Sequence, residues 1–159
     1  MTVPVTIRLQ EEDFDVAREI AALSRDRTDI GAVVSFSGIC RSDKADGEVG
    51  DAIAALVLEH YPGMAEEEIA RHAEEAVSRW PLTGLTVIHR FGRIVPGDNI
   101  VLVVTASSHR EAAFHAAEFL MDYLKTRAPF WKREEGSAGS SWVDAHDRDD
   151  TAAARWAKS

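Results

Sequence analysis

Hydrophobic positions alternate with polar ones or recur at helical spacing along most of the chain, and this pattern predicts a succession of strands and helices. Residues 3–9 alternate as a half-buried strand, in which Pro4 favours an edge position or a strand start. Apolar side chains recur near the helical period over residues 14–23 and predict the first helix. Residues 32–36 are apolar and largely β-branched between glycines, so they predict a buried strand that runs into a loop continuing through Gly50.

The middle of the chain predicts a second helix between strands. Residues 52–60 have a strand pattern, and the Tyr61-Pro62-Gly63 turn reverses the chain before a helix over residues 64–80. Residues 85–91 and 100–105 flank a Pro-Gly turn and are expected to pair as a hairpin. The buried stripe expected on this helix comprises Met64, Ile69, Ala73, Val77 and Trp80.

A long helix is predicted in the last third of the chain. Ser108 and Glu111 have the spacing of a capping box, in which two side chains satisfy backbone N–H groups at a helix start. Pro129 limits the helix, which we expect to end between Lys125 and Arg127. The core positions expected on it are Ala113, Ala116, Ala117, Leu120 and Leu124. Together the elements predict an α+β domain in which helices cover a largely antiparallel sheet.

Composition favours one domain, because 159 residues with 45% hydrophobic side chains suffice for a single substantial core. We expect it to span residues 1–145, followed by a charged tail over residues 146–159 that is partly ordered through Trp156. A net charge of −9 argues against a nucleic-acid-binding surface. One cysteine, no secretory signal and no apolar run near the roughly 20 residues of a bilayer span predict a cytoplasmic protein without a membrane segment.

The chemically suggestive stretch is residues 125–133, which concentrates four cationic side chains and no acidic one in an otherwise acidic chain. Cations beside aromatic rings can neutralise a phosphate and stack on a flat heterocycle. The alternative, equally compatible with composition, is a basic helix end that the helix dipole stabilises.

Other side chains extend this anion-site hypothesis. His109 and Arg110 lie at the predicted start of the long helix, where free N–H groups favour an anion, although His109 also fits an ordinary loop histidine. Arg41 follows a glycine-marked strand end, and a lone arginine is more often a solvated charge. Met121 shares a helix face with Lys125 and either lines the pocket or belongs to the core.

Two longer segments resemble signatures of the molybdopterin synthase large-subunit family. They are Leu58-Glu59-His60-Tyr61-Pro62-Gly63-Met64 and the run MDYLKTRAPFWKRE from Met121 to Glu134. Shorter matches in the family's order are Gly31-Ala32-Val33-Val34 with Gly38 and Arg41, Val87-Ile88-His89-Arg90, Pro96-Gly97-Asp98 and Ser108-His109-Arg110. The resemblance covers roughly residues 30–145, and so many separated matches exclude chance agreement.

This resemblance implies an α/β-hammerhead-type fold with a small added subdomain. It also implies a heterotetramer, in which two large subunits form a central homodimer and a small ubiquitin-like sulfur-carrier subunit docks at each end. The partner's C-terminal Gly-Gly thiocarboxylate then enters the large subunit's pocket and delivers sulfur to cyclic pyranopterin monophosphate. Two deliveries per pterin complete the dithiolene of molybdopterin.

The resemblance also assigns roles to matching positions. Lys125 and Lys132 are implied as catalytic lysines, and fixed cations suit a reaction in which sulfur attack and opening of a cyclic phosphate create negative charge. The residues implied to line the pterin and phosphate pocket are Arg41, His109, Arg110, Met121, Arg133 and Glu134. We expect no metal and no cofactor, because the sequence has neither a clustered Cys/His ligand set nor a Walker-type loop.

Some positions depart from the family's pattern or leave alternatives open. Relatives often carry an arginine where this chain has His146, which puts one cationic contact from the tail in doubt. Cys40 is interpreted as a small buried side chain that catalysis does not need. One alternative function is a non-catalytic adaptor for a ubiquitin-like tail, which would not need both lysines. Another is a phosphoesterase using His60 or His109, for which the sequence lacks a metal cluster or an evident nucleophile.

Overall fold

The computed structural model of the chain describes residues 2–42, 52–136, 139–143, 154, 156 and 157. Most of the predicted loop before Gly50 and most of the tail, including His146, lie outside these residues. The elements in chain order are β1 (Val5–Gln10), α1 (Val16–Ser24), β2 (Ala32–Ile39), β3 (Ile53–His60), α2 (Met64–Arg79), β4 (Leu82–Arg90), β5 (Gly92–Ile94), β6 (Asn99–Ser107), α3 (Arg110–Thr126), β7 (Phe130–Gly136) and β8 (Gly139–Val143). Among the described helices, none combines the length and apolar character that a bilayer span requires.

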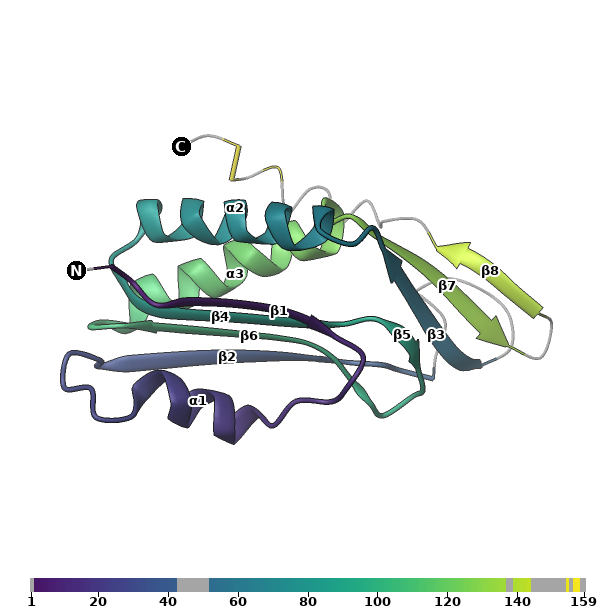
Figure 1. Cartoon of the computed structure of the whole chain (residues 1–159), viewed down its shortest axis with the longest axis horizontal. Coiled ribbons are helices and arrows are strands. Elements are labelled where there is room, and N and C mark those ends of the chain that lie inside the picture. The colour runs from purple at the N-terminus through teal and green to yellow at the C-terminus, as the bar shows by residue number, and fades with distance from the viewer. Residues whose placement is uncertain (1, 43–51, 137–138, 144–153, 155, 158–159) are drawn as a thin grey trace.

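The larger sheet has the strand order β1-β4-β6-β2, and helices lie on both of its faces (Figure 1). β1 runs parallel to β4, whereas β6 is antiparallel to both β4 and β2. The predicted hairpin is confirmed, since β4 and β6 pair with Val87 opposite Val103. The predicted edge position of the first strand is also confirmed, because among the described strands β1 pairs with β4 alone.

Alternate residues of β4 and β6 belong to two different cores. Val87 and Val103 pack with residues of α2 and α3, in a cluster that includes the fully buried Ile69. Ile88 and Leu102 belong to the cluster on the opposite face, which α1 covers (Figure 1). Both faces of these strands are therefore apolar, as expected where helices cover a sheet on two sides.

The prediction of a buried strand over residues 32–36 is wrong in its burial. β2 is longer than predicted and forms the second edge of the larger sheet. Phe36 and Ile39 remain 40% and 53% exposed. An apolar, β-branched run indicates that the backbone prefers to be extended. It does not indicate whether a neighbouring strand or helix will cover the side chains.

Two predictions about helix starts are also wrong. The Ser108–Glu111 capping box is absent, because His109 is the N-cap residue of α3 and Ser108 instead donates a hydrogen bond to the Asp29 carbonyl at 3.1 Å. Met64 does not join the buried stripe of α2 and is 50% exposed. It is the first residue of the helix, before the turn that packs on the sheet.

The smaller sheet is antiparallel and has the order β5-β3-β7-β8 (Figure 1). It corresponds to the small added subdomain that the family resemblance implied, and the α+β class with largely antiparallel pairing is confirmed. Its strand β7 was not predicted, because residues 130–136 are mostly polar and carry no strand-length apolar pattern. β7 pairs with β3, so that His60 lies opposite Phe130 and Leu58 opposite Lys132.

Candidate functional site

The predicted catalytic lysines come from different elements that meet where the two sheets join. Lys125 is exposed in the last turn of α3, and Lys132 is partly buried on β7. Both positive charges act on the buried side chain of His89 at the end of β4. Because Coulombic effects fall with distance, two lysines that both perturb one buried ring lie near the same point of the molecule.

His89 is held in its neutral form. Burial is the largest cause that lowers its pKa to about 4, and the charges of Lys132, Lys125 and His60 lower it further, against a backbone hydrogen bond that raises it. That bond runs from Nδ1 to the Arg90 carbonyl at 2.8 Å. A carbonyl only accepts, so Nδ1 carries the proton and the tautomer is fixed.

Aromatic rings fill the space between these groups. His89 stacks on Phe130 with ring centroids 4.1 Å apart and planes 17° from parallel. His60 meets Phe91 edge-on at 4.6 Å and lies 5.9 Å from the ring of Phe130. The lysines therefore stand beside an aromatic cluster, which matches the predicted combination of cations and flat rings.

The strand register places Lys132 on a definite face of the smaller sheet. Side chains alternate along a strand, so Phe130, Lys132 and Glu134 share one face of β7. Glu134 is buried on that face, 9% exposed. Arg133 points the other way and lies 3.7 Å from Glu135, and its buried Nε has no hydrogen-bond partner within the described part of the chain.

Cys40 connects this face to the end of β2. It is buried against Leu58 and Ile94, as the sequence predicted. Burial raises the pKa of its thiol, and nearby Asp98 and Glu134 raise it further while Lys132 lowers it. The thiol is therefore held protonated, which does not suit a sulfur carrier. Arg41 follows directly and is exposed, so the chain carries it to the same end of the molecule.

Not all predicted pocket residues gather here. Met121 lies one turn before Lys125 but is buried in the core beneath α3. His109 and Arg110 are exposed at the opposite end of α3. At 1.5 Å rise per residue, Arg110 is about 22 Å from Lys125 along the helix axis. A single chain thus brings together Arg41, Lys125, Lys132 and Glu134, but not His109 and Arg110.

Two functional candidates emerge only from the structure. From the sequence, His89 is only one residue of a short match to the family, and His60 is a candidate only for an alternative phosphoesterase activity. His60 is the last residue of the apolar strand β3 and His89 the second-last residue of β4, and this position near a strand end is the signal that the sequence offers. Within the described residues, no group of three or more His, Cys, Asp or Glu side chains is placed to hold a metal ion.

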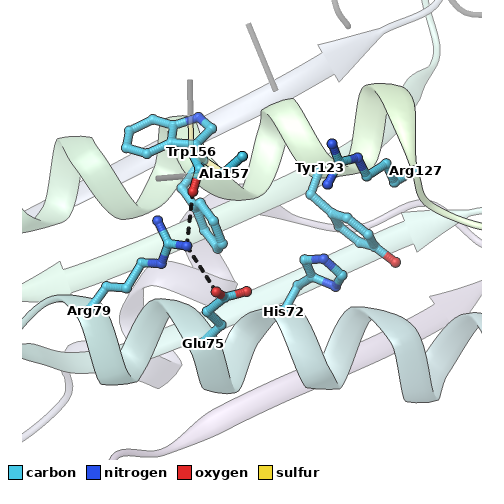
Figure 2. A pocket seen from close by; sticks show the side chains of 8 residues that line it. His72, Glu75, Arg79, Tyr123, Arg127, Trp156 and Ala157 are labelled. Atoms are coloured by element: carbon cyan, nitrogen blue, oxygen red, sulfur yellow. Dashed lines mark hydrogen bonds and ion pairs between the residues drawn. The ribbon is translucent and has the colours of Figure 1, made fainter. Parts of the chain in front are cut away.

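A separate hollow lies between α2 and α3 (Figure 2). Its volume is about 170 Å³, and none of the predicted site residues lines it. Arg79 reaches across it, donating to Glu75 at 2.9 Å and to the Trp156 carbonyl at 3.0 Å. The Trp156 ring contacts Trp80 and Phe119 edge-on. This hollow is therefore where the C-terminal segment packs on the helices.

Comparison with known proteins adds to this geometry. The family model described as "MoaE protein" matches residues 9–127. The molybdopterin synthase catalytic subunit of Mesorhizobium japonicum is 64% identical over 156 residues, which cover 97% of this chain and 94% of that protein. The structure of a molybdopterin biosynthesis MoaE protein from Burkholderia ambifaria superposes with a TM-score of 0.79 at 47% identity, covering 98% of this chain and 99% of that one. A chain in the complex of subunits 1 and 2 of molybdopterin-converting factor from Helicobacter pylori shares the fold, with a TM-score of 0.65 at 21% identity over 91% of both chains.

Proposed function

The chain belongs to the MoaE family of molybdopterin synthase catalytic subunits, sulfurtransferases of molybdenum cofactor biosynthesis, and from this premise we propose that Lys125 and Lys132 are its catalytic residues. The observation that carries the proposal is geometric: Lys132 shares a face of β7 with Phe130, which stacks on the buried ring of His89, and Lys125 lies in the last turn of α3, just before β7. Both lysine charges lower the pKa of His89, in agreement with this placement. Two cations converging beside aromatic rings suit an anionic, flat substrate.

The proposed substrate is cyclic pyranopterin monophosphate, and the proposed sulfur donor is the C-terminal thiocarboxylate of a small ubiquitin-like subunit. Attack of the thiocarboxylate sulfur on the pterin and opening of the cyclic phosphate both develop negative charge. Fixed ammonium groups stabilise such charge without reorganising. Arg41 and Glu134 lie at the same end of the molecule as the lysines and complete the proposed pocket on this chain.

A small-subunit partner is supported by the Helicobacter pylori structure, which is a complex of subunits 1 and 2. We place the reaction in the cytoplasm and expect the working assembly to be a heterotetramer around a central homodimer. In that assembly a second copy of the chain would supply His109 and Arg110, because the length of α3 separates them from Lys125 of their own chain. Arg133 alternates with Lys132 along β7 and therefore lies on the opposite face of the strand, so its proposed contact with the pterin pocket is not one that this chain alone brings together with the lysines.

The test supplies the purified chain with thiocarboxylated small subunit and pterin precursor, and measures dithiolene pterin. Lys125→Ala and Lys132→Ala should fold normally and lose at least about 100-fold in product formation, because the lost charge acts at the reacting centre. Arg127→Ala is the matched control, since it removes a nearby exposed cation that lines the other hollow. Near-normal yield from a folded lysine variant would remove that lysine from the mechanism, and yield without the small subunit would contradict the sulfur donor.

A further inference from the structure

His60 occupies the point where the two sheets and α3 meet. It is the last residue of β3 and pairs with Phe130, the first residue of β7. Lys132 lies two residues further along β7 on the same face, so it is a diagonal neighbour of His60 at a separation that a lysine side chain can bridge. His89 of β4 stacks on Phe130, whose ring centroid lies 5.9 Å from that of His60. The charges of His60, Lys132 of β7 and Lys125 of α3 all lower the pKa of His89.

Neither ring nitrogen of His60 makes a hydrogen bond within the described residues. Nδ1 is buried, yet the side chain as a whole is partly exposed, which leaves Nε2 on the part of the ring that solvent can reach. Polar atoms inside proteins are nearly always paired, so a buried Nδ1 without a hydrogen-bond partner among the described residues is unusual and indicates a group kept available for a ligand or a proton.

Other side chains near this point are less suited to accept a proton. His89 is buried, and its Nδ1 already donates to the Arg90 carbonyl. The Cys40 thiol is buried and packed against apolar side chains. A lysine in its ammonium form stabilises an anion but has no lone pair to offer. His60 is thus the imidazole at this meeting point of the sheets that is partly exposed and whose nitrogens have no hydrogen-bond partner among the described residues.

The proposed reaction contains a step that needs a proton acceptor. When the thiocarboxylate sulfur bonds to a pterin carbon, a carbon–oxygen bond at that carbon breaks and the oxygen leaves with the bonding electrons. The sulfur still bears the acyl group of the partner's terminal glycine, so the two molecules are joined by a thioester. Water must add to the acyl carbon: a C–O bond forms, the C–S bond breaks, the glycine leaves as a carboxylate and the sulfur stays on the pterin as a thiolate. Two protons are released from the water, and no electrons are exchanged with any other reagent.

We propose that His60 is the general base of this hydrolytic step, taking the first proton from the attacking water at Nε2. The second proton, from the acid product, passes to solvent. Lys132, on the same face, stabilises the oxyanion and the departing thiolate. The inference rests on the proposed function, because it assigns a residue to the release of the partner after each sulfur transfer. Imidazole suits the task, because its neutral ring offers a nitrogen lone pair that accepts a proton from water.

The test compares His60→Gln and His60→Ala with His115→Gln, a control on α3 whose histidine contacts Trp80 away from the junction. Each variant receives thiocarboxylated small subunit and pterin precursor. We expect His60→Gln to fold, to form the covalent partner–pterin adduct at a normal rate and to turn over roughly 10²–10⁴-fold more slowly, the usual range for a lost general base. Intact-protein mass spectrometry should show the adduct accumulating on the small subunit.

Two rescue measurements separate a general base from a structural residue. Imidazole in the buffer should restore part of the turnover of His60→Ala, and hydroxylamine, a nucleophile that needs no base, should release the trapped small subunit as its hydroxamate. Wild-type turnover by His60→Gln, or slow turnover with neither adduct nor rescue, would overturn the inference while leaving the proposed function intact. If the unaltered chain makes no dithiolene from the same reagents, the proposed function itself fails.

Discussion

At the scale of single residues, His89 and His60, which lie near the meeting point of the two sheets, differ in burial and in hydrogen bonding. His89 is buried, stacked on Phe130 and bonded through Nδ1, so its ring is a neutral support near pH 7. His60 has the same chemical group, but its nitrogens are unpaired within the described residues. Identical side chains thus acquire different chemical capacities from burial and hydrogen bonding.

The low pKa of His89 makes the stability of the protein depend on pH. Its folded-state pKa of about 4 lies below the ordinary value of 6.5, so the unfolded chain binds the proton more readily and the folded state loses stability as pH falls from about 6.5 to 4. The difference corresponds to about 3 kcal/mol. Urea unfolding of the unaltered chain and His89→Gln at pH 7 and pH 4.5 should show a smaller loss for the variant. Equal losses would mean that carboxylates alone set the acid sensitivity.

At the scale of elements, α2 and α3 are held together by more than their contact with the sheet. Trp156, from beyond β8, packs its ring edge-on against Trp80 and Phe119, and its Nε1–H donates to Asp122. A single aromatic anchor can therefore tie a charged C-terminal segment to the helix layer.

Removing that anchor should lower stability without removing the site. We expect Trp156→Ala to reduce the free energy of unfolding by about 2 kcal/mol, because a partly buried indole loses its packing and a hydrogen bond. Trp156→Phe should recover most of the packing and lose only the hydrogen bond. Thermal unfolding gives the stability, and the dithiolene assay on folded protein gives the activity. A large activity loss in Trp156→Phe at unchanged stability would place the tail in the reaction.

At the scale of the whole molecule, the length of α3 separates two groups of cations that the family resemblance assigns to one pocket. Lys125 and Arg110 lie at its opposite ends, about 22 Å apart. Rotation of a helix cannot bring its own ends together. If both groups serve one pterin, they come from two copies of the chain, and each homodimer carries two shared pockets.

Mixing two inactive variants tests this arrangement. Lys125→Ala and Arg110→Ala should each make little product, whereas an equal mixture that has exchanged subunits should regain about a quarter of the wild-type activity. Half of its dimers are mixed, and each mixed dimer has one pocket with both cations intact. Light scattering checks whether each variant forms the proposed homodimer. Activity in the mixture no higher than in the separate variants would place Arg110 outside the pocket or on the same chain as Lys125.

The sequence by itself determined those features that depend on neighbours along the chain. The apolar periodicity located α2, α3 and the β4–β6 hairpin, and the basic run beside Pro129 marked the lysines of the candidate site. Local spacing suffices there, because helical or strand periodicity and turn residues act over a few positions.

Only the tertiary structure decided the pairings between distant segments. β7, whose polar residues carry no strand-length apolar pattern, forms because β3 lies beside it and satisfies its backbone hydrogen bonds. That pairing turns Lys132 toward His60 and Arg133 away from it. The edge position of β2 and the separation of Arg110 from Lys125 are likewise properties of the assembled fold. A one-residue change of strand register would reverse which side chains face the site. The contacts that set this register join residues about 70 to 80 positions apart in the sequence.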